Sequence, residues 1–389
     1  MLNSRNRVGL PIYLAALNMR AGLVLVGPLI PILKNYFNLS NSALSILAGL
    51  PILCFAATSL VMSKVAKLGS SNRIIKLALT ALTIAMIGRA TTGLIGLYFF
   101  ALCMGLAIAV MNYELPAWVK EHAPNDSGYL TGVYVTIMGL AAAVSVAISV
   151  PLAEINSLSW RMSMLPWIAI STLATLYWWL KKDNSKQNDS FEVPVFWRSK
   201  AFKNPIAWAL VLFFGLESMT FYATATWFPT ILTTKGFTLS SAAIALSLSG
   251  IIGSAVGVIF PHYFEKSGSQ RAMLIGTSLF TALSFFMVTL QTGWVLFIWL
   301  ALSNIGISIA FPLALMMAGL KSNSPEATRN LSTMMQAFGY SISATGPYFM
   351  AKLHEISDSW DIAMYGVVVI CLLQAGASYI VGKPSKIDY

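Results

Sequence analysis

Two charged residues lie in the middle of segments that are otherwise apolar. Arg20 interrupts the run LNMRAGLVLVGPLIPIL at residues 17–33, and Glu217 interrupts an apolar segment near residues 206–232. A charge at the centre of a bilayer costs at least about 2.5 to 3.5 kcal/mol, so such residues generally mark a site for a ligand or an ion. A guanidinium can bind an anionic group, and a carboxylate can balance that charge or carry a proton. Both residues lie about 18 Å into their segments, so we expect Arg20 and Glu217 to form a buried pair. The pair either belongs to a ligand site or is purely structural.

The composition around these charges is that of an integral membrane protein. Of the 389 residues, 57% are hydrophobic and 10% are charged, whereas about a quarter of the residues are charged in soluble domains. A helix of about 20 apolar residues can cross the hydrocarbon core. Twelve such segments are predicted, at approximately 9–33, 42–63, 74–93, 96–117, 128–153, 162–180, 206–232, 241–262, 272–291, 294–317, 330–352 and 362–381.

Lys and Arg residues are distributed unevenly between the two sides of these predicted helices. Nineteen lie in the termini and loops of one side, and four lie on the other: Lys34, Arg161, Lys235 and Lys352. Cytoplasmic loops carry the excess of positive charge, so both termini are assigned to the cytoplasm. This distribution accounts for the net charge of +11, so we expect a lipid bilayer as partner and no nucleic acid.

The two halves of the chain resemble each other. A shift of 201 residues superposes Gly105 on Gly306, Lys120 on Lys321, Pro124 on Pro325, Pro28 on Pro229 and Lys34 on Lys235. Two six-helix pseudo-repeats predict an all-α membrane fold with a cavity near the bilayer midplane. The expected domains are an N-terminal bundle at residues 1–181, a cytoplasmic linker at 182–204 and a C-terminal bundle at 205–389. Alternating access is the mechanism that this architecture favours.

Two further charges lie nearer the ends of apolar segments. Arg89 is close to the outer end of the third segment, and Glu114 is close to the inner end of the fourth. Both are candidates for coupling or gating. The alternatives are an interface anchor or a structural hydrogen bond for Arg89, and a partnership with cytoplasmic basic residues for Glu114.

Uncharged polar residues form two faces at helical spacing. Glu217, Thr220 and Thr224 share one face, and Gln336, Tyr340 and Ser343 share another. Such faces suit a substrate cavity, and they suit hydrogen bonding between helices equally well. In the first segment Asn18 is about 200° around the helix from Arg20, so we expect Asn18 to brace a neighbouring helix.

Signatures of catalysis and cofactor binding are missing from the sequence. Cys54, Cys103 and Cys371 lie in apolar segments at unrelated spacings, so neither a disulfide nor a metal site is predicted. No phosphate-binding loop, zinc-ligand pattern, GxSxG or GxGxxG motif is present. The expectation is a protein that is not an enzyme and uses no cofactor or metal.

With these features placed, the chain resembles the major facilitator superfamily and, within it, the cyanate and 2-nitroimidazole transporter family. The resemblance covers nearly the whole chain and rests on "NMR" with "GPLIP", "LPILCFA", "LPAWVK", "WFPTIL", "FPLAL" and "LSTMMQAFGYSISATGP". It implies a secondary transporter for a small molecule. On this resemblance Arg20, Arg89, Asn112, Gln336 and Tyr340 fall on motif positions.

Two acidic residues depart from the family pattern. Where the family usually has "GLQS" this chain has "GLES", so Glu217 replaces the usual glutamine. Glu114 occupies a position where the family usually has an apolar residue. The hypothesis is therefore a monomeric transporter in which Arg20 binds a polar or anionic group and Glu217 is its counter-ion, with proton coupling through Glu217. The alternatives are a polyspecific drug or metabolite exporter, favoured by 18 Met residues, and a receptor that signals without transport.

Overall fold

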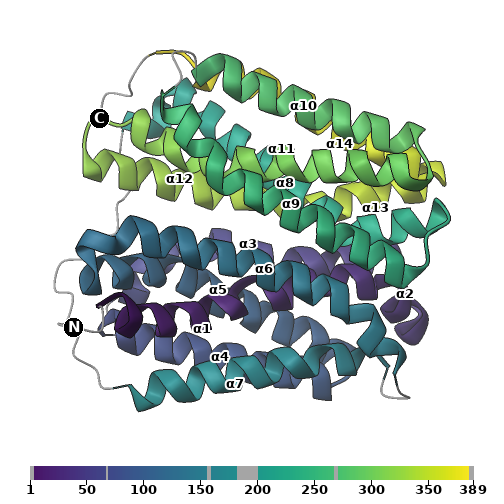
Figure 1. The fold of residues 1–389 in the computed structure, drawn as a ribbon, viewed down its shortest axis with the longest axis horizontal. Helices are drawn as coiled ribbons and strands as arrows, with labels where there is room; N and C mark the ends of the chain where they lie inside the picture. Colours follow the sequence, from purple (N-terminus) through teal and green to yellow (C-terminus); the bar gives the residue numbers. More distant parts are fainter. Residues whose placement is uncertain (1–3, 67–68, 156–158, 182–199, 267–269, 385–389) are drawn as a thin grey trace.

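The computed structural model describes residues 4–66, 69–155, 159–181, 200–266 and 270–384, and within these ranges the regular structure is entirely helical. The helices lie side by side in two bundles, α1 to α7 in one and α8 to α14 in the other (Figure 1). α1 begins and α14 ends at the same end of the molecule, which we call the terminal end, and the opposite end is called the far end. Residues 182–199 of the predicted linker lie outside the described residues.

The helix bounds agree with the predicted twelve crossings. The first bundle contains α1 Ser4–Val24, α2 Val26–Phe37, α3 Asn41–Ala66, α4 Ser71–Thr91, α5 Leu94–His122, α6 Ser127–Glu154 and α7 Leu165–Leu180. The second contains α8 Pro205–Thr234, α9 Leu239–Lys266, α10 Gln270–Leu290, α11 Gly293–Leu320, α12 Pro325–Ser343, α13 Gly346–Ser357 and α14 Trp360–Val381. Short 3-10 helices at Pro124–Asp126, Ser159–Met164 and Lys200–Lys203 join some of these elements.

Among the described residues, nine helices are long and apolar enough to cross a membrane alone, and α1 with α2 forms a tenth crossing bent by 42°. α7 and the interrupted pair of α12 and α13 run beside them and complete the twelve. The all-α membrane fold predicted from the sequence is thus confirmed.

The first crossing bends at Leu25, between α1 and α2. Pro28 has no N–H for the Val24 carbonyl, and its ring displaces that carbonyl, which breaks the helix one turn earlier. Side chains from two other helices bind the carbonyls at the bend. Ser145 Oγ of α6 donates to the Ala21 carbonyl at 2.9 Å, and Arg89 Nη1 of α4 donates to the Gly22 carbonyl at 2.9 Å. These bonds hold the bend in place within the first bundle.

A second break, at residues 344–345, separates α12 from α13. Pro347 cannot donate to the Ser343 carbonyl, so the helix is interrupted there for the same reason. The Pro347 carbonyl accepts hydrogen bonds from Ser45 Oγ of α3 at 3.0 Å and from Trp227 Nε1 of α8 at 2.8 Å. The broken crossing therefore contacts both bundles at once.

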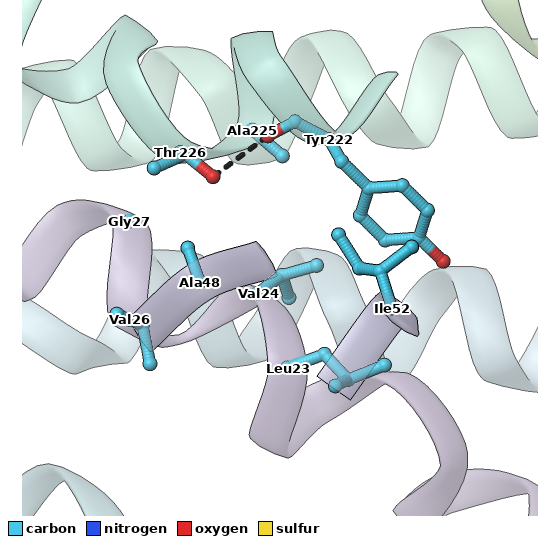
Figure 2. Close-up of a pocket in the computed structure, with 9 residues that line it drawn as sticks. All are labelled: Leu23, Val24, Val26, Gly27, Ala48, Ile52, Tyr222, Ala225 and Thr226. Atoms are coloured by element: carbon cyan, nitrogen blue, oxygen red, sulfur yellow. Dashed lines mark hydrogen bonds between the residues drawn. The ribbon is translucent and has the colours of Figure 1, made fainter. Parts of the chain in front are cut away.

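At the far end the two bundles approach each other at the level of the backbone. A Cβ added to Gly27 would lie 2.1 Å from the Ala225 carbonyl oxygen, and one added to Gly49 would lie 2.7 Å from the Ala344 carbonyl oxygen. We call the contact around Gly27 the apolar seam, and Figure 2 shows its members. It consists of Leu23, Val24, Val26, Gly27, Ala48 and Ile52 against Tyr222, Ala225 and Thr226.

Hydrogen bonds also join the two bundles at the far end. Glu355 of α13 accepts bonds from the Ser42 backbone N–H at 3.0 Å and from Ser42 Oγ at 2.8 Å, at the start of α3. A carboxylate at a helix N-terminus is further stabilised by the helix dipole. Together with the bond from Ser45, these side-chain hydrogen bonds join the two bundles at this end. The structure is therefore closed at the far end.

Substituting Gly27 by Val is expected to disfavour this closed arrangement. The new Cβ would collide with the α8 backbone, and overpacking typically costs about 1 to 3 kcal/mol, enough to change conformational populations about tenfold. Spin labels at the exposed residues Tyr36 and Ile356, with the native cysteines replaced by alanine, should then show longer distances in electron paramagnetic resonance.

Gly276→Val is the control, because a Cβ at Gly276 meets no atom within 4 Å. Unchanged distances in Gly27→Val, or an equal change in the control, would contradict the role given to the seam.

Candidate functional site

Arg20 projects from α1 toward the second bundle. Its Cζ atom lies 5.5 Å from the ring centroid of Phe221 on α8 and 5.5 Å from that of Phe311 on α11. A guanidinium over an aromatic face gains a cation–π attraction, which satisfies none of its five N–H donors. Among the described residues the Arg20 side chain has no hydrogen-bond or ion-pair partner, so it remains available to an anionic ligand.

Arg20 lines a cavity of about 90 Å³ between the two bundles. Polar side chains of the second bundle contribute much of the wall: Thr224, Ser247, Ser254, Asn304 and Ser308. Asn304 Nδ2 donates to Ser249 Oγ at 3.1 Å, which fixes its amide group beside the cavity. The opposite wall comes from α6 and consists of Gly139, Ala142, Ala143 and Val146. The cavity thus combines one unpaired cation with several neutral hydrogen-bonding groups.

Glu217 does not form the predicted ion pair with Arg20. Its side chain is buried, with 2% of the residue exposed, and its Oε2 atom accepts a hydrogen bond from Ser218 Oγ at 2.9 Å. Arg20 lies instead over Phe221, which is one helical turn further along α8 than Glu217. The two charges are still close enough to interact electrostatically. Arg20 and Glu217 therefore lie near each other without forming the predicted direct pair.

Tyr340 of α12 lies in the same region. Its ring makes edge contacts with Phe55 of α3 at 5.2 Å and with Phe214 of α8 at 5.1 Å, measured between centroids. Its phenol group is within electrostatic range of Arg20 and Glu217. Tyr340 therefore connects the first bundle to the second close to the two charges.

The two threonines of the predicted α8 face have different surroundings. Thr224 lines the cavity, with its hydroxyl donating to the Thr220 carbonyl at 2.8 Å. The Thr220 hydroxyl donates to the Leu216 carbonyl at 2.9 Å and lies 3.9 Å from Cys371 Sγ of α14, inside the second bundle. The structure brings Thr224 to Arg20 and leaves Thr220 among the packed helices.

Asn112 of α5 and Gln336 of α12 are both partly exposed. Among the described residues neither side chain forms a hydrogen bond, and neither lines the Arg20 cavity. Asn18 differs from its prediction, because its Nδ2 atom donates to the Leu14 carbonyl of its own helix at 2.8 Å rather than bracing a neighbour.

Arg89 and Glu114 are buried within the first bundle. Arg89 is 1% exposed and is bound to the Gly22 carbonyl and to Met104 Sδ, at 2.9 and 3.1 Å. Glu114 is 5% exposed and lies close to the Ser71 side chain. Neither residue lines the Arg20 cavity. The bond from Arg89 corresponds to the structural alternative considered for that residue.

Comparison with known proteins places this architecture in a family. The chain matches the family model of the Major Facilitator Superfamily over residues 12–347. The chain belongs to the Major Facilitator Superfamily. It is a multi-pass membrane transporter and not an enzyme.

Three bacterial relatives match this transporter over nearly its full length. A protein of Bacillus subtilis (strain 168) named as an uncharacterized transporter is 29% identical over 96% of this chain and 92% of its own length. The 2-nitroimidazole transporter of Escherichia coli (strain K12) is 27% identical over 99% and 98%. The cyanate transport protein of the same organism is 24% identical over 94% of each. The predicted family resemblance is confirmed.

A solved structure shares the fold. A bacterial homolog of the human lysosomal transporter Spinster, in an inward-facing and unoccupied conformation, superposes with a TM-score of 0.81 at 16% identity. The match covers 99% of this chain and 98% of that chain.

The sequence alone did not predict several residues that line the transporter's cavity. Ser247 and Ser254 of α9 are seven residues apart, and Asn304 and Ser308 of α11 are four apart, so each pair shares a helix face. This spacing was the available signal. It is weak, because small polar residues are common in membrane helices and usually mediate helix packing.

Replacing Arg89 or Arg20 by glutamine should affect the transporter's stability differently. Arg89→Gln removes the bond to Gly22 and leaves a buried carbonyl unpaired, at a cost of about 1 to 3 kcal/mol. Arg20→Gln removes an unpaired charge that makes no hydrogen bond, so its melting temperature should equal or exceed that of the wild type. Thermal unfolding in a neutral detergent measures both. If the melting temperature of Arg20→Gln fell as much as that of Arg89→Gln, Arg20 would be a structural residue.

Proposed function

We propose that the chain is a secondary active transporter that moves a small polar or anionic organic molecule across the bacterial inner membrane. The observation that carries this proposal is the unpaired Arg20 guanidinium in the wall of the cavity between the bundles. A charge inside the membrane is costly, and this one gains no ion pair in return. A bound anion would provide the missing partner through charge-assisted hydrogen bonds.

The size and chemistry of the cavity support a small polar ligand. Its volume of about 90 Å³ is well below the roughly 300 Å³ at which pockets for drug-sized ligands begin. Neutral donors and acceptors of Thr224, Asn304 and Ser308 surround the cation and could orient a compact molecule. The alternative of a polyspecific exporter requires a larger and more apolar cavity than this one.

Alternating access follows from the way the bundles meet. We assign the terminal end to the cytoplasm because nineteen of the Lys and Arg residues lie on that side. On this assignment the closed far end faces the periplasm, and the structure is inward-facing. Transport requires the seam around Gly27 to open while the bundles, residues 1–181 and 205–389, rock as two bodies joined by residues 182–204.

The names of the relatives are consistent with a small polar cargo. One relative is named for 2-nitroimidazole and another for cyanate, a compact anion. Both molecules contain few atoms, and both carry polar groups that a guanidinium can bind.

Transport by purified protein in liposomes tests the proposal. The test compounds represent two classes of cargo. Small polar or anionic molecules are represented by cyanate, 2-nitroimidazole and benzoate, and the cargo of a polyspecific exporter is represented by the lipophilic cation tetraphenylphosphonium. We expect uptake of at least one of the first three, reduced at least tenfold in Arg20→Gln, because a lost charged hydrogen bond costs about 1.5 to 3 kcal/mol.

Arg161→Gln is the matched control, since this arginine also lies over an aromatic ring, that of Trp160, but away from the cavity. Uptake of the lipophilic cation alone, or anion uptake that is equal in Arg20→Gln, would contradict the proposal and favour the exporter.

Proton coupling through Glu217 is proposed as the energy source. The carboxyl group is buried, interacts electrostatically with Arg20 and has one hydroxyl donor, Ser218. A ligand that neutralises Arg20 removes the charge that favours the ionised carboxylate, so ligand and proton binding are coupled.

An inward proton gradient should therefore accelerate uptake by the wild type and have no effect on Glu217→Gln. Rates measured with and without the gradient test this, and Glu154→Gln at the exposed end of α6 is the control. A gradient effect of the same size in Glu217→Gln would show that another group carries the proton.

A further inference from the structure

A second cavity lies between the bundles at the far end, beyond the apolar seam that closes the route from Arg20. It has a volume of about 250 Å³ and is formed by α2, α3, α8, α13 and α14. Its wall contains Lys34, Asn35, Thr230, Thr233 and His354, and no acidic residue. The only full charge on the wall of this far-end cavity is thus positive.

Lys34 differs from the other basic residues assigned to this end of the molecule. Among the described residues its ammonium group forms no ion pair or hydrogen bond. Each of the others has a partner: Lys235 pairs with Asp361 at 3.0 Å, Lys352 pairs with Glu355 at 3.5 Å, and Arg161 binds Tyr36 Oη at 3.1 Å. The contrast with Lys235 is informative, because the internal repeat superposes Lys34 on Lys235. The second half of the chain supplies a carboxylate for its lysine, and the first half does not.

Two buried polar atoms of the same wall also lack partners. Among the described residues, His354 Nδ1 and Thr230 Oγ1 are buried and form no hydrogen bond, and both residues line the far-end cavity. Buried polar atoms are nearly always hydrogen-bonded to protein or to ordered water. Two such atoms beside an unpaired lysine leave hydrogen-bonding capacity in this wall that ordered water or a polar ligand would satisfy.

The aromatic side of the cavity is rigid and flat. The His354 ring stacks on Trp360 with centroids 4.0 Å apart and planes 10° apart. Trp360 packs in turn against Trp227 at 4.9 Å, and Trp227 Nε1 is fixed by the Pro347 carbonyl at 2.8 Å. A planar ligand fits beside such a wall better than a branched one.

We propose that the far-end cavity is a second binding site, separate from the Arg20 cavity, for a small planar monocarboxylate. Lys34 pairs with the carboxylate, and the side chains of Thr230 and His354 supply further hydrogen bonds. Binding at this site does not depend on the proposed function, because a ligand can occupy it whether or not the protein transports that ligand. On the proposed topology the site faces the periplasm and precedes the closed seam.

Calorimetry with benzoate as the probe tests this site in isolation when Arg20 is first replaced by glutamine. Arg20→Gln, purified in a neutral detergent, is expected to bind benzoate saturably. Adding Lys34→Gln should weaken that binding at least tenfold. Adding Lys352→Gln should leave it unchanged, because Lys352 is at the same end but does not line the cavity.

Because Lys34 is exposed, its substitution should not alter the melting temperature, and thermal unfolding of each variant verifies this. The site would be refuted if Arg20→Gln bound no benzoate, or if Arg20→Gln with Lys34→Gln bound it equally well. If the wild-type protein took up none of cyanate, 2-nitroimidazole and benzoate while this binding was intact, the proposed function alone would be contradicted.

Discussion

The bend of the first crossing at Leu25 is the feature on which the other parts of the site depend. Pro28 makes a straight helix impossible, and Arg89 and Ser145 hold the displaced turn by binding the Gly22 and Ala21 carbonyls. The bend directs α2 against α8, where Gly27 meets the Ala225 carbonyl. One local break in a helix thus separates the Arg20 cavity from the far end.

Arg20 and Arg89 illustrate two ways in which a membrane protein can hold a buried guanidinium. Arg89 is buried and donates hydrogen bonds to a backbone carbonyl and a sulfur atom of the first bundle. Its role is therefore structural. Arg20 is only partly buried, lies against two rings and makes no hydrogen bond with the described residues. A side chain that is held in position without being neutralised is suited to a ligand that arrives and leaves.

Much of the fold could be predicted, because hydropathy, basic residues and the internal repeat each reflect the bilayer or the duplication directly. The proximity of Arg20 and Glu217 could also be predicted, since both lie about the same number of residues into their segments. The absence of a direct ion pair between them could not be predicted, because it depends on Phe221 packing against the Arg20 guanidinium. The far-end cavity could not be predicted from the sequence either. Lys34, Thr230 and His354 belong to three crossings that are distant in sequence and line one cavity only in the folded chain.

In the proposed mechanism the cargo contacts the Arg20 guanidinium directly. The most direct test is a structure determined with the transported anion bound at saturating concentration. We predict an oxygen atom of the anion at about 2.7 to 2.9 Å from the Arg20 guanidinium, on the cavity side facing Thr224 and Asn304. An anion bound elsewhere while Arg20 remains over Phe221 and Phe311, or Arg20 paired with Glu217 in the occupied state, would contradict it.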